Sequence, residues 1–167
     1  MAVLAGLGLV AGCVLALVVG LQPDSLVDTP TRVAEPSTPV QVRGLDADLV
    51  ARFRQAAITA HAEAGIEITI TSGWRSAAQQ QEILDAKVAE VGVDEAHRLV
   101  APVDASAHVQ GLALDVGPYD GALWLRAEGW RFGLCQVYVN EPWHFEPTVD
   151  PGTTCPPLVP DVSGLWR

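Results

Sequence analysis

Basic residues and cysteines are scarce in this sequence. Lysine and arginine together number 10 against 20 aspartates and glutamates, which gives the 167 residues a formal net charge of −10. An acidic surface of this kind argues against electrostatic binding to nucleic acid or to an anionic membrane surface. No internal repeat is apparent. The length indicates one compact domain with an extra segment, and not two domains.

Only three cysteines are present, at positions 13, 135 and 155, and no CxxC pair suggests metal ligation. Cys13 lies inside an apolar N-terminal stretch, which leaves Cys135 and Cys155 in the folded part. Because the chain carries an export signal, we expect these two residues to form a disulfide. Such a bridge stabilises a fold by about 3 kcal/mol in the chain-entropy model. The alternative is a pair of buried free thiols.

Charged side chains are absent from residues 1–21. A helix of this length spans roughly 31 Å, close to the hydrocarbon thickness of a bilayer. We therefore expect a membrane anchor, with the folded domain outside the cytoplasm. A cleaved signal peptide, which would release a secreted protein, is the second choice because no clear A-x-A cleavage site is present. Residues 22–41 are rich in proline and are predicted to form an extended linker.

The remaining sequence alternates between helical and strand-like patterns. Apolar residues at helical spacing predict helices, and short β-branched or apolar runs predict strands. The predicted helices cover 46–64, 77–91 and 120–132, and the predicted strands cover 66–71, 112–116 and 134–139. Residues 93–103 give no clear pattern. We expect an α+β domain over 42–160, irregular after Glu146, and a short C-terminal tail over 161–167.

Two stretches hold the residues most suited to metal chemistry. His108 and Asp115 lie seven positions apart around a glycine, and a second stretch supplies Glu141 and His144. An aspartate inside an apolar strand is costly to bury unless it is paired or binds a metal. Two imidazoles, one carboxylate ligand and one further carboxylate suit a hydrolytic zinc site, because its fourth coordination position stays open for water. A structural zinc site usually has four protein ligands, often cysteines, and fits less well.

Arg75 lies in the turn between the predicted strand 66–71 and the predicted helix 77–91. A turn that follows a strand commonly aims a guanidinium into a cleft. Taken alone, the position is equally compatible with an ion pair to a surface acid.

Taken together, these residues resemble the VanY-type zinc D-Ala-D-Ala carboxypeptidases, within the wider group that includes lysostaphin-like enzymes and the hedgehog signalling domain. The resemblance covers roughly residues 45–156 and rests on three motifs in order. They are Ser72-Gly73-Trp74-Arg75-Ser76, then Ser106-x-His108-x-x-Gly111-x-Ala113-x-Asp115, then Glu141-x-Trp143-His144. The resemblance implies a small antiparallel sheet flanked by helices, with a zinc site on the sheet.

The resemblance also implies roles for the residues of these motifs. His108, Asp115 and His144 would hold Zn²⁺, and Glu141 would be the catalytic base. Glu146 is a weaker candidate for the base, because the family pattern places the base before the Trp-His pair.

Substrate contacts follow from the same resemblance. Arg75 would contact the carbonyl or carboxylate of the substrate and oppose the charge that develops during the reaction. Gln80 and Ser106 would line the substrate cleft. Many relatives carry an arginine where this chain has Gln136, which puts a contact there in doubt. Trp143 is expected to pack between the base and the ligand and not to contact substrate.

The implied function is zinc-dependent hydrolysis of a peptide bond in peptidoglycan stem peptides, with release of terminal D-alanine as the first choice. An L-Ala-D-Glu endopeptidase or a dipeptidase on the same scaffold is the alternative among enzymes. A non-catalytic zinc domain that binds cell-wall peptides is the alternative outside them. The expected partners are the stem peptide and, through the N-terminal helix, the membrane, and we expect a monomer.

Overall fold

The fold comes from a computed structural model, which describes residues 42–166. The predicted anchor over 1–21 and the predicted linker over 22–41 lie outside the described residues, as does Arg167. Among residues 42–166, no helix has the length and apolar character that a membrane span requires.

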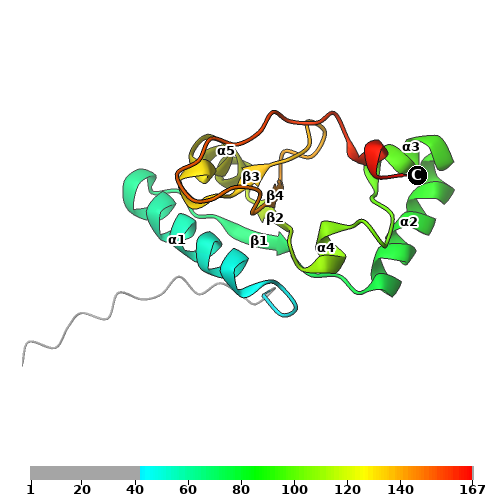
Figure 1. The fold of residues 1–167 in the computed structure, drawn as a ribbon, viewed down its shortest axis with the longest axis horizontal. Coiled ribbons are helices and arrows are strands. Elements are labelled where there is room, and N and C mark those ends of the chain that lie inside the picture. Colours follow the sequence, from blue (N-terminus) through cyan, green and yellow to red (C-terminus); the bar gives the residue numbers. More distant parts are fainter. Residues whose placement is uncertain (1–41, 167) are drawn as a thin grey trace, which may run out of the picture. The chain divides into compact units, whose positions relative to one another are not determined.

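A four-stranded antiparallel sheet forms the centre of the domain (Figure 1). Its order is β1 (Thr69–Ser72), β2 (Leu114–Gly117), β4 (His144–Glu146) and β3 (Cys135–Gln136). In this register Asp115 lies opposite His144 on one side and opposite Ser72 on the other. Strand pairing therefore brings together residues that are far apart in the sequence. The predicted α+β class and small antiparallel sheet are confirmed.

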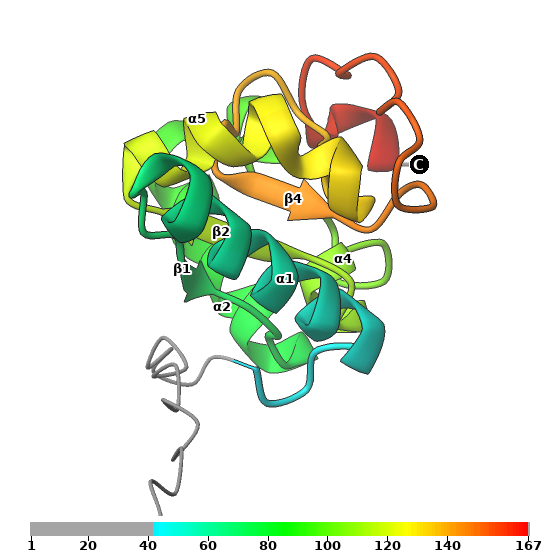
Figure 2. The same ribbon diagram turned by 90° about the vertical axis from the view of Figure 1, so that its left-hand side faces the viewer.

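Two helices, α1 (Ala47–Ala64) and α5 (Tyr119–Glu128), lie against one face of the sheet (Figure 2). The start of α1 is fixed by Asp46, whose carboxylate accepts the backbone N–H groups of Asp48 and Leu49. Gly65 ends the helix in the left-handed conformation, at φ +66°. Buried apolar side chains from both helices and the sheet form the main core, which includes Leu49, Phe53, Ile70, Leu114, Val116, Leu125 and Phe145.

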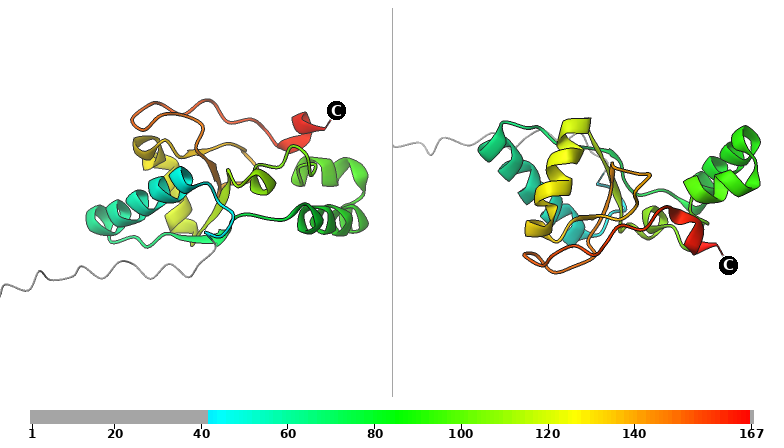
Figure 3. Two further views of the ribbon diagram at one scale, coloured as in Figure 1. Left: turned by 60° about the horizontal axis from the view of Figure 1, so that its bottom comes forward. Right: turned by 90° about the horizontal axis from the view of Figure 1, so that it is seen from above.

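A second, smaller group of elements lies apart from the main core. It consists of α2 (Ala77–Val91), α3 (Val93–Leu99) and the short 3₁₀ helix η2 (Val162–Leu165), which Figure 3 shows side by side. Its buried apolar residues are Leu84, Ala96 and Val100. The short helix α4 (Ala107–Gln110) connects this group to β2.

Several element boundaries differ from the sequence-based prediction. The helix predicted over 120–132 divides into α5 and the 3₁₀ helix η1 (Gly129–Phe132). A Cβ atom at Gly129 would collide with the carbonyl oxygen of Leu134, so the chain packs too closely there for a larger residue. The strand predicted over 134–139 shortens to two residues, because Tyr138 bridges to Val159 instead of β4.

The cysteines at positions 135 and 155 form the predicted disulfide, with their Cα atoms 5.6 Å apart. This bridge ties the irregular segment after β4 to β3. The segment then continues into η2, so part of the predicted tail over 161–167 packs against α3.

Candidate metal centre

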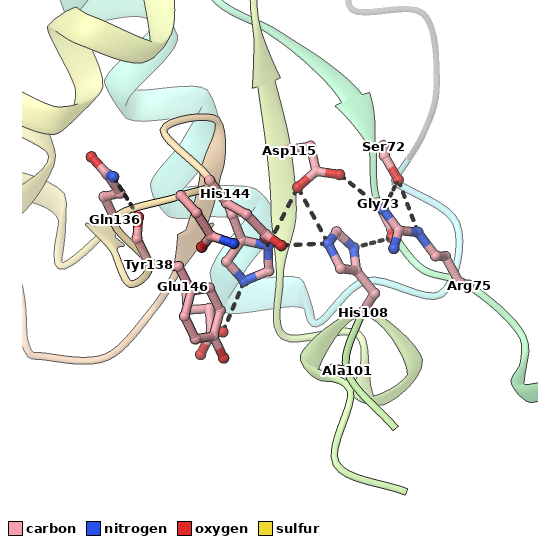
Figure 4. Close-up of polar contacts among 12 residues, drawn as sticks. Ser72, Gly73, Arg75, Ala101, His108, Asp115, Gln136, Tyr138, His144 and Glu146 are labelled. Carbon is pink, nitrogen blue, oxygen red and sulfur yellow. Dashed lines mark hydrogen bonds and ion pairs between the residues drawn. The ribbon is translucent and has the colours of Figure 1, made fainter. Parts of the chain in front are cut away.

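Three buried side chains converge beside the two inner strands of the sheet (Figure 4). His108 comes from α4, Asp115 from β2 and His144 from β4. The Nε2 atom of His108 lies 3.2 Å from Nδ1 of His144 and 3.3 Å from Oδ1 of Asp115. Nδ1 of His144 lies 3.3 Å from the same Oδ1. The three residues predicted as metal ligands thus form an almost equilateral triangle of donor atoms.

The outer nitrogen of His108 defines which tautomer this ring adopts. Nδ1 of His108 lies 2.7 Å from the carbonyl oxygen of Gly73, an atom that can only accept a hydrogen bond. A neutral ring therefore carries its proton on Nδ1. Nε2 then presents a lone pair to the centre of the triangle.

His144 is oriented in the same way by Glu146. Nε2 of His144 donates to Oε1 of Glu146 over 2.9 Å, which leaves the lone pair of Nδ1 facing Asp115 and His108. Burial disfavours a charge on His144, but hydrogen bonds to Asp115 and Glu146 prevail and raise its pKa to about 9. A proton and a metal ion therefore compete for the lone pair on Nδ1.

The spacing of the donor atoms suits a tetrahedral zinc ion. Ligands about 2.0–2.1 Å from the metal in a tetrahedral arrangement lie about 3.3 Å from one another. The observed separations are 3.2–3.3 Å. Three lone pairs that face a common point repel one another unless a cation lies between them. Two imidazoles and one carboxylate fill three positions, and the fourth remains for water.

Arg75 holds the second oxygen of the carboxylate ligand. Its Nη2 donates to Oδ2 of Asp115 over 2.9 Å and to Oγ of Ser72, also over 2.9 Å. Burial opposes ionisation of Asp115, but its contacts with His108 and His144 prevail and lower its pKa. Arg75 therefore orients a predicted ligand, a role that the sequence did not suggest. Its predicted contact with substrate stays a prediction.

Glu141 lies next to the triangle, with Oε2 3.7 Å from Nδ1 of His144. Burial raises the pKa of Glu141, and the nearby His144 counteracts that effect in part. A carboxylate with a raised pKa is a better proton carrier near neutral pH. Glu141 therefore lies beside the donor triangle, where the predicted general base is expected, and its role in catalysis stays a prediction.

The donor triangle opens into a cavity of about 230 Å³, which the other predicted substrate residues also line. Gln80 is buried, and its Nε2 donates to the carbonyl oxygen of Ala101 over 2.9 Å. Ser106 is buried at the cavity wall. Trp143 also lines the cavity and is 46% exposed, so it is packed less closely than expected, and the expectation that it does not contact substrate stays a prediction.

Two residues of this site were missed by sequence reasoning. Glu146 was considered only as a base, although its spacing two residues after His144 on a strand puts both side chains on the same face. That spacing could have revealed it as the partner of the histidine. Tyr138 lines the cavity as well, and burial together with the charges of Glu146 and Glu141 raises its pKa to about 12. No sequence signal distinguishes Tyr138. Gln136 lies outside the cavity lining.

A single metal ion with three protein ligands and an adjacent acid is the class of centre that this geometry fits, and such centres are typical of hydrolases. A sequence model of the VanY D-alanyl-D-alanine carboxypeptidase family matches residues 43–131, more than half of the 167 residues. The chain therefore belongs to this family, as the motifs predicted. The matched residues include His108 and Asp115. Glu141 and His144 lie beyond the match, and the third sequence motif together with the geometry adds them.

Individual proteins that are similar to this chain belong to the same family. The chain is 33% identical over 108 residues to a D-alanyl-D-alanine carboxypeptidase of Enterococcus faecalis, a match that covers 48% of this chain and 40% of that protein. The structure of a mutant VanY from a VanB-type resistance cassette, in complex with Zn(II), matches with a TM-score of 0.59 and 27% identity. That match covers 63% of this chain and 73% of the other.

A third relative shows that the fold hosts another specificity. An L,D-carboxypeptidase, DacB, from Streptococcus pneumoniae matches with a TM-score of 0.51 and 25% identity, over 67% of this chain and 68% of the other. These structures confirm the predicted fold. Zinc is the metal that the donor set and the solved relative both indicate.

Proposed function

We propose that this protein is a zinc-dependent peptidase that removes the terminal D-alanine from peptidoglycan stem peptides. The observation that carries the proposal is the donor triangle of His108, Asp115 and His144, at 3.2–3.3 Å, with Glu141 beside it. Membership of the VanY family and the name of the Enterococcus faecalis relative support D-alanyl-D-alanine as the substrate. The Zn(II) complex of the VanY structure supports the choice of metal.

The chemistry divides between the metal and the side chains around it. Zinc, when bound, supplies Lewis acidity and lowers the pKa of its water to about 7. Glu141 lies where it can accept the proton of the attacking water and return it to the leaving amine. Burial suits Glu141 to this exchange, because it favours the protonated form between the two transfers.

Arg75 serves both the ligand set and the substrate in this proposal. Nη2 is occupied by Asp115 and Ser72, whereas Nη1 makes only a long contact of 3.4 Å with Oε1 of Gln80. Nη1 therefore keeps an N–H group that can donate to an oxygen of the substrate. A donor in such a position stabilises the negative charge that develops on the carbonyl oxygen.

The test is turnover of an N-acetylated peptide that ends in D-Ala-D-Ala, measured as released D-alanine and by mass analysis of the products. Activity should disappear with a chelator and return with zinc. Glu141→Gln should lower turnover about 10²–10⁴-fold while zinc content stays that of the parent protein. Glu63→Gln, on an exposed surface pair with Arg131, is the matched control and should retain activity. Turnover that is insensitive to the chelator, or cleavage inside the stem only, would overturn the proposal.

The N-terminal segment supports a proposal about location. The uncharged apolar residues 1–21 and the proline-rich linker over 22–41 would hold the domain outside the cytoplasm at the membrane, and the disulfide suits an oxidising compartment. Fractionation of cells that express the full chain, combined with protease access from outside, tests this arrangement. Recovery of the chain in the medium would favour a cleaved signal peptide. Light scattering would test the expected monomer.

A further inference from the structure

The cavity at the metal centre has a second half that the hydrolytic chemistry does not use. One half holds the donor triangle, Glu141 and Arg75. The other half is built by α2, α3 and η2, and its lining consists of Ile83, Lys87, Leu99, Val100, Val162 and Leu165. Gln80 on α2 also lines the cavity, but its amide is hydrogen-bonded to Arg75 and Ala101, so the remaining polar group of this half is one ammonium group.

That ammonium group belongs to the only lysine in the sequence. Lys87 lies seven residues after Gln80 on α2, a spacing of two helical turns, so both side chains lie on the face toward the cavity. Its side chain is 31% exposed, and Nζ lies 2.6 Å from a carboxylate oxygen of Glu90, which is 63% exposed. An ion pair between exposed side chains of one helix is weak. The ammonium can therefore exchange Glu90 for a ligand in the cavity.

The other charges of the cavity make Lys87 distinctive. Asp115, Glu141 and Glu146 are acidic, and Nη2 of Arg75 is bonded to the carboxylate of Asp115, so Lys87 is the cation of the lining that lies outside the ligand set. An anionic group that enters the apolar half therefore meets a cation at Lys87, whereas three of the charged groups around the donor triangle are acids. Apolar walls together with one cation fit the chemistry of a small amino acid with a free carboxylate.

We propose that this half of the cavity receives the residue that is cleaved off, with Lys87 binding its terminal carboxylate and Val162 and Leu165 enclosing its side chain. The inference rests on the function proposed above and adds the reason for cleavage at the chain end. A volume of about 230 Å³ is below the roughly 300–1,000 Å³ of sites for drug-sized ligands, so it suits one or two residues. If several residues followed the cleaved bond, they would need more room. The first of them would then have no terminal carboxylate for Lys87 to bind.

The wall formed by η2 is held in place by specific contacts. Asp161 accepts from Nε of Arg98 over 3.0 Å, and the indole of Trp166 stacks on His97 with the ring centres 3.5 Å apart. The indole N–H of Trp166 also donates to the carbonyl oxygen of Val100 over 3.2 Å. These contacts hold the described C-terminal segment in place as one wall of the cavity.

The experiment compares two peptides of the same sequence, both N-acetylated and both ending in D-Ala-D-Ala. One ends in the free carboxylate and the other in the carboxamide, and kcat/KM is measured for both with the full-length zinc protein. The parent protein should prefer the carboxylate. Lys87→Met should reduce that preference at least about tenfold, chiefly through KM, because the charged hydrogen bond is lost. Lys87→Arg should keep most of the preference, and Glu90→Gln, outside the cavity, should leave it intact.

The outcomes separate this inference from the proposed function. If the parent protein cleaves neither peptide, the proposed function fails. If it cleaves the carboxylate peptide but Lys87→Met keeps the parent preference, the subsite is wrong and the function stands. Zinc content and the thermal midpoint of Lys87→Met establish that the variant is folded. A parent protein that cleaves acid and amide equally well also overturns the subsite.

Discussion

The two halves of the domain differ in how they are held together. The sheet region, which consists of β1–β4, α1, α5 and η1, is built on a large cluster of buried apolar side chains. The wall region, which consists of α2, α3 and η2, has a small buried cluster. Much of its cohesion comes from polar and aromatic contacts on the surface, such as the ion pair between Arg98 and Asp161. Burial of apolar area is the larger source of stability, so the sheet region should be the more stable half.

This difference corresponds to a division of labour at the cavity. Asp115 and His144 lie on strands next to Leu114 and Phe145, whose side chains enter the main core. The positions of the ligands are therefore fixed by the most stable part of the molecule. The wall region contributes shape and the charge of Lys87 but no ligand. Chemistry and specificity can then change independently, and the following predictions test that separation.

The largest effect is expected from a cavity in the sheet region. Phe145 is fully buried between two residues of the metal site, and Phe145→Ala should lower the free energy of unfolding by about 3–5 kcal/mol. Zinc affinity should fall with it, because His144 loses its support. Urea unfolding of the zinc-free protein measures the first effect and chelator competition the second. Tyr119→Ala, which removes an exposed ring, is the control and should change both values little.

The corresponding cavity in the wall region should have a different consequence. Leu84 is 8% exposed, and Leu84→Ala should cost about 2–3 kcal/mol, near the lower limit for such changes. The cost should appear as faster hydrogen exchange in α2 and α3 and as a higher KM. Zinc affinity should stay close to that of the parent protein. A loss of zinc affinity as large as that of Phe145→Ala would contradict the separation of the two regions.

Within the sheet region, the partner of a ligand should have a measurable but smaller influence. Glu146→Gln removes the charge that orients His144 and should weaken zinc binding about 10–100-fold, or about 1.4–2.7 kcal/mol. Competition with a chromophoric chelator at constant pH measures the affinity. Glu128→Gln, on the surface near Arg131, is the matched control. Parent-like affinity in Glu146→Gln would remove Glu146 from the metal site.

How well the sequence predicts a feature depends on how far apart the interacting residues lie along the chain. The ends of α1 are local, since Asp46 and Gly65 act on their own helix, and they were predicted within one residue. The family motifs identified all three ligands. The donor triangle itself depends on pairing between β2 and β4, nearly 30 residues apart, and no local pattern contains that register.

The failures of prediction have the same physical origin. The strand predicted over 134–139 is apolar enough for six residues, but the backbone groups of Val137 and Val139 bond to Val159. Helix α3 forms in a stretch without a clear pattern because Ala96 packs into the small cluster with α2. In both cases a distant partner outweighs local propensity. The role of Arg75 as support for Asp115 was hidden for the same reason.

The smallest effect is expected at Gln136, a buried polar side chain in the largely apolar sheet region. Gln136 lies opposite Phe145 and is buried; its Nε2 donates to the carbonyl oxygen of Tyr138, and its Oε1 has no partner among the described residues. Gln136→Met removes an unpaired oxygen that costs about 1–3 kcal/mol, but it also removes a hydrogen bond and leaves the carbonyl oxygen of Tyr138 without its donor, at a similar cost. The two effects oppose each other, so the free energy of unfolding in urea should change by less than about 1 kcal/mol, with turnover retained. Gln136→Glu should lower stability, because a buried carboxylate would face a carbonyl oxygen. If Gln136→Met is clearly less stable than the parent protein, a further donor must reach Oε1. The core of the sheet region would then contain a fully hydrogen-bonded polar side chain.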